Sequence, residues 1–148
     1  LQTVNMVNVP VVCKERNITI SERRSTNETN YHTLIRVTVT AGNKQRSISG
    51  TLFGGDKPRI VEIEDIPMEA ELGPTMLFVR NLDKPGFIGS LGRTLGEAGI
   101  NIATFHVGRE APGGNAIALI EIDGELPADV LAKVRALPQV QQAKPLHF

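Results

Sequence analysis

Residues 81–106, NLDKPGFIGSLGRTLGEAGINIATFH, decide the fold that we expect for this chain. They read as a turn, an amphipathic helix and a strand. Pro85 has a fixed φ that suits a first helical turn, and Asp83 is placed to cap the exposed N–H groups of that turn. Gly99 stands where a left-handed C-terminal cap belongs. The free N–H groups and the helix dipole predict a place for a small anion at the helix N-terminus.

The helix predicted over residues 86–98 has one apolar face, because its apolar residues recur at helical spacing. These residues are Ile88, Leu91, Leu95 and Ala98. Residues 75–80 precede the turn and predict a strand. Residues 101–109 alternate between two faces and predict another.

The elements that follow complete a known arrangement. A turn at residues 111–114 joins residues 101–109 to a strand at 115–123 as a hairpin, a second helix lies between Pro127 and Pro138, and residues 140–146 make a last strand. The order strand, helix, strand, strand, helix, strand is the ferredoxin-like βαββαβ arrangement. Both helices would cover one sheet face, and we expect the other face to be open to solvent or a partner.

The first half of the chain predicts a different module. We expect a short strand at residues 4–9, a turn of helix at 10–16 and β character at 18–21, while residues 22–30 are polar and fit a loop or strand end. Four strands then follow, at residues 34–40, 46–53, 59–63 and 66–72, with glycine-containing turns at residues 42–43 and 54–56 between the first three,. The Gly-Pro pair at residues 73–74 punctuates the chain. The predicted fold class is α+β: a mainly antiparallel sheet module, residues 1–73, followed by a ferredoxin-like domain, residues 74–148.

Composition limits the function classes. The 148 residues suffice for one ordinary domain or two small ones,. With 16 basic and 16 acidic residues the formal net charge is zero, which argues against a nucleic-acid partner,. Cys13 is the single cysteine, so no intrachain disulfide is possible and we expect a cytoplasmic protein,. No apolar run reaches 18 residues, so no membrane span is predicted. The chain starts at Leu1 without Met, and we expect it to be a piece of a longer polypeptide.

No catalytic constellation and no metal-ligand cluster is evident in the sequence. Lys57 and Arg59 follow a Gly-Gly turn at residues 54–55, and two cations beside such a turn can hold a phosphate or carboxylate,. Two solvated cations on a loop are an equally good interpretation of these residues.

Three polar residues predict a ligand site of another kind. Asn81 and Asp83 end one strand, and Asn101 begins its neighbour at the opposite rim, so they should not meet within one copy. If two copies pair edge to edge in antiparallel fashion, Asn101 of one approaches Asn81 and Asp83 of the other. Asp83 would then hold an ammonium group, while amides and helix N–H groups hold a carboxylate. Residue types alone favour the other interpretation, in which these residues are turn and cap formers.

The segments DKPGFIG (83–89) and EAGINIATF (97–105) resemble an ACT domain, the amino-acid-sensing module of metabolic enzymes. The preceding segments VNMVNVPVV (4–12) and SISGTLFGGDKPRIVEI (47–63) look like the allosteric substrate-binding domain. Together they resemble the C-terminal regulatory region of the long form of D-3-phosphoglycerate dehydrogenase, the NAD-dependent first enzyme of serine biosynthesis.

The resemblance implies that L-serine binds at an ACT dimer interface as a feedback effector. The effector positions of the family fall on Asn81, Asp83, Pro85, Gly86, Phe87, Ile88 and Asn101. Asn81 stands where the family often has His or Tyr. Arg59, with Lys57, falls on a basic position used for a phosphorylated substrate, and a second basic position is Glu71 here. The catalytic domains, which bind NAD, would lie upstream, so this part would bind and form a dimer or tetramer without a cofactor or catalysis of its own.

Two other interpretations stay open. The β-part of a bacterial L-serine dehydratase resembles the same pair of modules, and a GxGxxG segment upstream would favour the dehydrogenase over it. A purely structural module would use its sheets for assembly and bind nothing small.

Overall fold

The computed structural model describes residues 4–24 and 31–148. The chain divides into two compact units, Leu1–Asn30 and Tyr31–Phe148. In the first unit, helix α1 (Val9–Glu15) confirms the helical turn expected there. The strand expected at residues 4–9 is wrong, and residues 18–21 contain no strand. Of the polar segment 22–30, residues 25–30 lie outside the described part.

The side chain of Asn5 explains why the apolar alternation of residues 4–9 does not make a strand. Its Oδ1 accepts the backbone N–H groups of Val7, at 2.9 Å, and Asn8, at 3.1 Å. Short polar side chains that bond to nearby backbone in this way favour turns over strands. The chain therefore turns at residues 6–8 and enters the helix, with Pro10 in its first turn.

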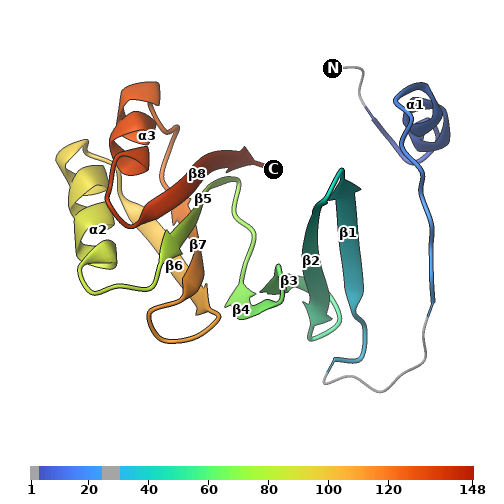
Figure 1. Ribbon diagram of the computed structural model, residues 1–148, viewed down its shortest axis with the longest axis horizontal. Helices are drawn as coiled ribbons and strands as arrows, with labels where there is room; N and C mark the ends of the chain where they lie inside the picture. Colours follow the sequence, from blue (N-terminus) through green and yellow to red (C-terminus); the bar gives the residue numbers. More distant parts are fainter. Residues whose placement is uncertain (1–3, 25–30) are drawn as a thin grey trace. The chain divides into compact units, whose positions relative to one another are not determined.

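The second unit begins with an antiparallel sheet of four strands, in the order β1-β2-β3-β4 (Figure 1). Its strands are β1 (Ile35–Ala41), β2 (Lys44–Phe53), β3 (Lys57–Ile63) and β4 (Ile66–Ala70). Gly42 and Gly54 supply positive φ in the first two turns. In the third turn Glu64 and Asp65 both have positive φ, as a two-residue hairpin of type I′ requires,. The antiparallel module expected from the sequence is confirmed.

A second sheet of four strands follows, in the order β6-β7-β5-β8. Its elements are β5 (Thr75–Leu82), α2 (Phe87–Glu97), β6 (Ile102–Arg109), β7 (Asn115–Ile122), α3 (Ala128–Arg135) and β8 (Val140–His147). Both helices lie on one side of this sheet (Figure 1). The ferredoxin-like βαββαβ order, and with it the α+β class, is confirmed.

Helix α2 ends in the cap that the sequence predicts. Gly99 has a φ of +74°, its N–H donates to the Gly96 carbonyl at 2.9 Å, and the Ile100 N–H donates to the Leu95 carbonyl at 3.0 Å. This pair of bonds is a Schellman motif. Leu91 and Leu95 are fully buried, so the apolar face of α2 packs on the sheet as its periodicity predicts.

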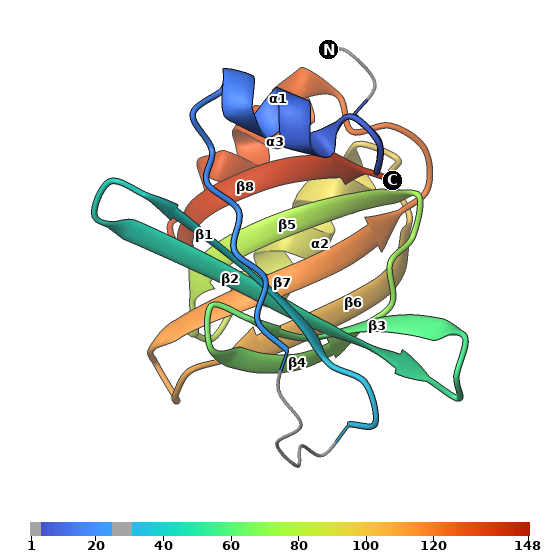
Figure 2. The same ribbon diagram turned by 90° about the vertical axis from the view of Figure 1, so that its right-hand side faces the viewer.

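The face of the second sheet that carries no helix is not open, which corrects the expectation from the sequence. Ile66 and Met68 of β4 pack in one cluster with Ile117 and Leu119 of β7. In the view of Figure 2, β1 and β2 of the first sheet run across the direction of β5 and β7. The alternation along β7 leaves apolar side chains on both faces of the sheet, and burying them against the first sheet is favourable.

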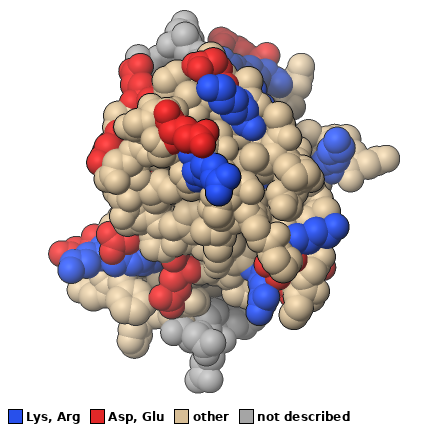
Figure 3. All heavy atoms as spheres, turned by 90° about the vertical axis from the view of Figure 1, so that its left-hand side faces the viewer, with Lys and Arg blue, Asp and Glu red and all other residues tan. Residues whose placement is uncertain are grey.

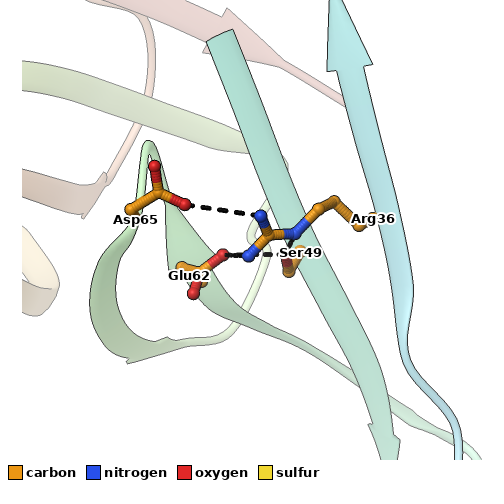
Figure 4. A network of polar contacts seen from close by, with 4 residues as sticks. All are labelled: Arg36, Ser49, Glu62 and Asp65. Atoms are coloured by element: carbon orange, nitrogen blue, oxygen red, sulfur yellow. Dashed lines mark hydrogen bonds and ion pairs between the residues drawn. The ribbon is translucent and has the colours of Figure 1, made fainter. Parts of the chain in front are cut away.

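Ion pairs between the β3–β4 turn and arginines of other strands reinforce the contact between the two sheets. Glu64, in the β3–β4 turn, pairs with Arg46 of β2 at 2.7 Å and with Arg80 of β5. Beside it, Asp65 pairs with Arg36 of β1 at 3.3 Å. Figure 4 shows Arg36 reaching from β1 toward Asp65, Glu62 and Ser49, with its Nε donating to Ser49 Oγ at 3.2 Å. Both carboxylates of the turn are thus paired with arginines from other strands.

Candidate functional site

Asn81, at the end of β5, carries a buried acceptor atom without a donor. Its side chain lies on the same face of the sheet as those of Leu77 and Val79, which is the face that the helices cover. The residue is 1% exposed. Nδ2 donates to the Leu82 carbonyl at 2.9 Å, while Oδ1 has no hydrogen-bond partner in the described part of the chain. An unsatisfied buried acceptor costs about 1–3 kcal/mol. Such an atom is suited to accept a hydrogen bond from a ligand.

Asp83 does not cap helix α2, so that expectation is wrong. The N-cap is Gly86, with a φ of +90°, and no side chain in the described ranges makes a cap hydrogen bond there. The Asp83 N–H donates to the Gly114 carbonyl at 2.8 Å. This bond ties the residue to the β6–β7 hairpin, and its carboxylate bonds to that hairpin.

The carboxylate of Asp83 is held by two donors. Its Oδ2 accepts from Arg109 Nη1 at 3.0 Å and from the Gly113 N–H at 3.3 Å. The hydrogen bond from the Arg109 guanidinium, followed by that from the Gly113 backbone, lowers the pKa of Asp83. Asp83 is therefore a negative charge whose orientation the hairpin fixes.

The first turn of α2 offers backbone rather than side-chain groups. Pro85, Gly86 and Ile88 are exposed, whereas the Phe87 side chain lies in the core at 3% exposed. Only the backbone of Phe87 is therefore able to meet a ligand. The first N–H groups of a helix have no intrahelical acceptor, although that of Phe87 donates to the Lys84 carbonyl at 3.4 Å just before the helix,. No side chain of the described residues makes a cap hydrogen bond here, so the helix dipole favours a negative group at this end,.

Asn101 directly precedes β6, at the end of that strand opposite to Arg109. It is exposed, and its Nδ2 donates to Asp123 Oδ2 at 2.8 Å. Arg109 ends β6 eight residues later, which is about 26 Å along an extended strand,. Asn101 and Asp83 are thus far apart within one copy, as the sequence predicts.

The two cations of the first sheet differ in their surroundings. Lys57, at the start of β3, is exposed. Arg59 forms an ion pair with Glu71, and its Nη1 donates to the Pro58 carbonyl at 3.3 Å. Glu71 thus neutralises the cation that was expected to bind an anion.

Local sequence patterns do not connect Asp83 with Arg109 or Gly113, because both lie in the hairpin, 26 and 30 residues after Asp83. The available signal was an arginine at the last residue of a strand, placed to reach the turn after β5 once the hairpin folds.

Other kinds of site find no support in the described residues. No group of three His, Cys, Asp or Glu side chains in the described ranges is arranged to hold a metal ion. None of the described helices is long and apolar enough to cross a membrane. On the surface seen in Figure 3, acidic and basic side chains are mixed rather than gathered by sign.

Comparison with known proteins places two families along the chain. Residues 1–64 match the D-3-phosphoglycerate dehydrogenase intervening domain, and residues 75–139 match the ACT domain. The chain is 35% identical over 141 residues to D-3-phosphoglycerate dehydrogenase of Methanocaldococcus jannaschii, covering 95% of this chain and 26% of that protein.

Two bacterial relatives give the same result. The chain is 34% identical to D-3-phosphoglycerate dehydrogenase of Bacillus subtilis, covering 96% of this chain and 27% of that protein. It is 30% identical to the Mycobacterium tuberculosis protein of the same name, covering 90% of this chain and 26% of that protein. The chain therefore spans about a quarter of the length of these relatives.

Proposed function

This chain consists of a D-3-phosphoglycerate dehydrogenase intervening domain and an ACT domain, matching the C-terminal regulatory region of these enzymes, and we propose that it binds L-serine as a feedback effector. The whole protein would be a cytoplasmic, NAD-dependent oxidoreductase of serine biosynthesis. Within this chain, the boundary between the intervening domain and the ACT domain would lie at residues 73–74.

The observation that carries this proposal is the buried Oδ1 of Asn81, which lacks a donor among the described residues, five residues before a helix N-terminus that none of their side chains caps. A free amino acid has an ammonium group that needs acceptors and a carboxylate that needs donors. Asn81 and Asp83 offer acceptors, and the N–H groups of Gly86 and Ile88 at the start of α2 offer donors, while that of Phe87 donates to the Lys84 carbonyl,. Ligand and site are thus complementary in polarity.

A second copy of the chain would complete the site. β6 is an edge strand of its sheet, and it pairs with β7 on one side. If the β6 strands of two copies pair in antiparallel fashion, Asn101 of one copy comes to the end of β6 where Asp83 and Arg109 of the other lie. Serine bound between the copies would favour one arrangement of subunits over another, which is how an effector acts on a distant active site.

Lys57 and Arg59 are proposed as a weaker anion site. A phosphorylated ligand there must displace Glu71 from Arg59, so its binding would be opposed by the loss of that ion pair.

Calorimetric titration of this chain with L-serine tests the proposal. We expect saturable binding, with glycine and D-serine binding more weakly because they lack or misplace the hydroxymethyl group. Asn101→Ala should lose the binding, and Asn43→Ala, the same change in an exposed turn of the first sheet, should keep it. No binding of L-serine by a chain shown to be dimeric would overturn the proposed function.

A further inference from the structure

We propose that Arg109 determines the specificity of the effector site by binding the carboxylate of an amino acid whose ammonium group is bound by Asp83. This inference rests on the proposed function and adds a residue to its site. The ligand class that follows is the free α-amino acid, with both of its charges present.

The two side chains form a fixed pair of opposite charges at the surface. Asp83 comes from the turn after β5 and Arg109 from the last position of β6, and their charged atoms are 3.0 Å apart. The Gly113 N–H, at 3.3 Å from the same carboxylate oxygen, holds Asp83 from a third direction. Backbone and hairpin thus orient the pair before any ligand arrives.

Both partners keep unused bonding capacity. The side chains of Asp83 and Arg109 are 31% and 58% exposed. Within the described residues, both hydrogen bonds of the Asp83 carboxylate go to Oδ2, and Arg109 bonds through Nη1 alone. A guanidinium has five N–H donors in a fork that matches a carboxylate. Asp83 Oδ1 and the remaining donors of Arg109 are therefore available to a ligand.

An amino acid is itself a pair of opposite charges separated by one carbon atom. Laid antiparallel over the Asp83–Arg109 pair, it places each of its charges against the opposite charge of the protein. A ligand that lacks either charge leaves one protein charge facing a neutral group, so the site selects for the zwitterion. Asp83 lies two residues after Asn81 and three before Gly86, so the pair stands at the proposed effector site.

The alternative is a salt bridge that only holds the hairpin to the turn. Removing Arg109 would then loosen the hairpin and would weaken all ligands alike. The two roles differ in ligand discrimination, which is the quantity to measure.

The test is a calorimetric titration of the chain with L-serine and with L-serinamide, which keeps the ammonium group and side chain but replaces the carboxylate by a neutral amide. The unmodified chain should prefer L-serine by at least about tenfold, the equivalent of one charge-assisted hydrogen bond. Arg109→Gln should lower the affinity for L-serine by a similar factor and leave that for L-serinamide within about twofold, removing the preference. Arg93→Gln, at an exposed position of α2, is the matched control and should keep it.

Each outcome of this titration either supports or overturns the role of Arg109. An unchanged preference in Arg109→Gln overturns the role of Arg109 while leaving serine binding in place. Absence of serine binding by the unmodified chain overturns the proposed function and this inference together. Should Arg109→Gln fail to fold, Arg109→Lys retains a cation without the fork, and it should keep part of the preference. A folded lysine variant that keeps the full preference of the unmodified chain would contradict the inference.

Discussion

At the residue scale, Asp83 illustrates how neighbours set the charge state of a single group. The Arg109 hydrogen bond and the Gly113 backbone N–H lower its pKa, because both interact with the ionised form,. A folded-state pKa below the unfolded value of about 3.9 means that the pair stabilises the fold at pH values above that range. The stabilisation is lost as the pH falls through the folded pKa.

We expect Arg109→Gln to raise the pKa of Asp83 toward its ordinary value, because the largest cause of the lowering is removed. NMR titration of the carboxyl carbon in both proteins measures the two values. Arg93→Gln serves as the control and should leave the titration of Asp83 where it is in the unmodified chain. An Asp83 that titrates at the same pH with and without Arg109 would contradict the pairing.

At the element scale, the β3–β4 turn is held by charges from outside its own hairpin. Glu64 has a φ of +51° and Asp65 one of +64°, a conformation that residues other than glycine adopt at a cost,. Two ion pairs of Glu64 offset this conformational cost, one to Arg46 within its sheet and one to Arg80 of the second sheet. The turn therefore depends on the packing of both sheets.

Glu64→Gln should destabilise the chain by about 1–3 kcal/mol, because it leaves Arg80, whose side chain is 24% exposed, without its counter-charge,. Urea unfolding of the two proteins measures the difference. Asp129→Asn provides the comparison: its pair with Lys133, at 3.9 Å, is exposed on both sides, and exposed pairs of this kind contribute about 0–1 kcal/mol,. Equal effects of the two substitutions would show that the Glu64 bridge is only a surface pair.

At the scale of the second unit as a whole, the two sheets meet where β6 carries no side chain. A Cβ atom at Gly108 would lie against the Pro67 carbonyl, 2.9 Å from Ile66 Cγ2 and 3.1 Å from Met68 Cβ. The β4 backbone and the branched side chain of Ile66 cannot move aside without separating the sheets. The close approach at Gly108 thus sets the spacing over which the inter-sheet cluster is buried.

We expect Gly108→Ala to lower the free energy of unfolding by about 1–3 kcal/mol, the range for overpacking a close contact. Gly92→Ala is the same change in the interior of α2, where nothing lies within 4 Å, and it should stabilise by about 0.5–1 kcal/mol through helix propensity,. Thermal unfolding of both variants distinguishes the two effects by sign. Tolerance of alanine at residue 108 would mean that the sheets do not approach so closely in solution.

Much of the fold was predictable because its causes are local. The period of Leu91 and Leu95, the cap at Gly99 and the alternation along the strands act between residues a few positions apart, so the sequence alone predicts the βαββαβ order and the antiparallel module before it,. The early strand at residues 4–9 is wrong for a local reason too, since the side chain of Asn5 bonds to the following backbone instead.

The amino-acid sequence by itself determined the elements, their order and the polar residues around Asn81. Tertiary structure decided which partners the residues and strands contact. Asp83 pairs with Arg109 rather than with the helix, and Arg59 pairs with Glu71. Strand β4 covers the sheet face that was expected to be open. These partners lie 12 or more positions apart along the chain. Which of several possible charges or apolar strands a residue meets depends on how the sheets cross, and periodicity and local propensity carry no information about that crossing.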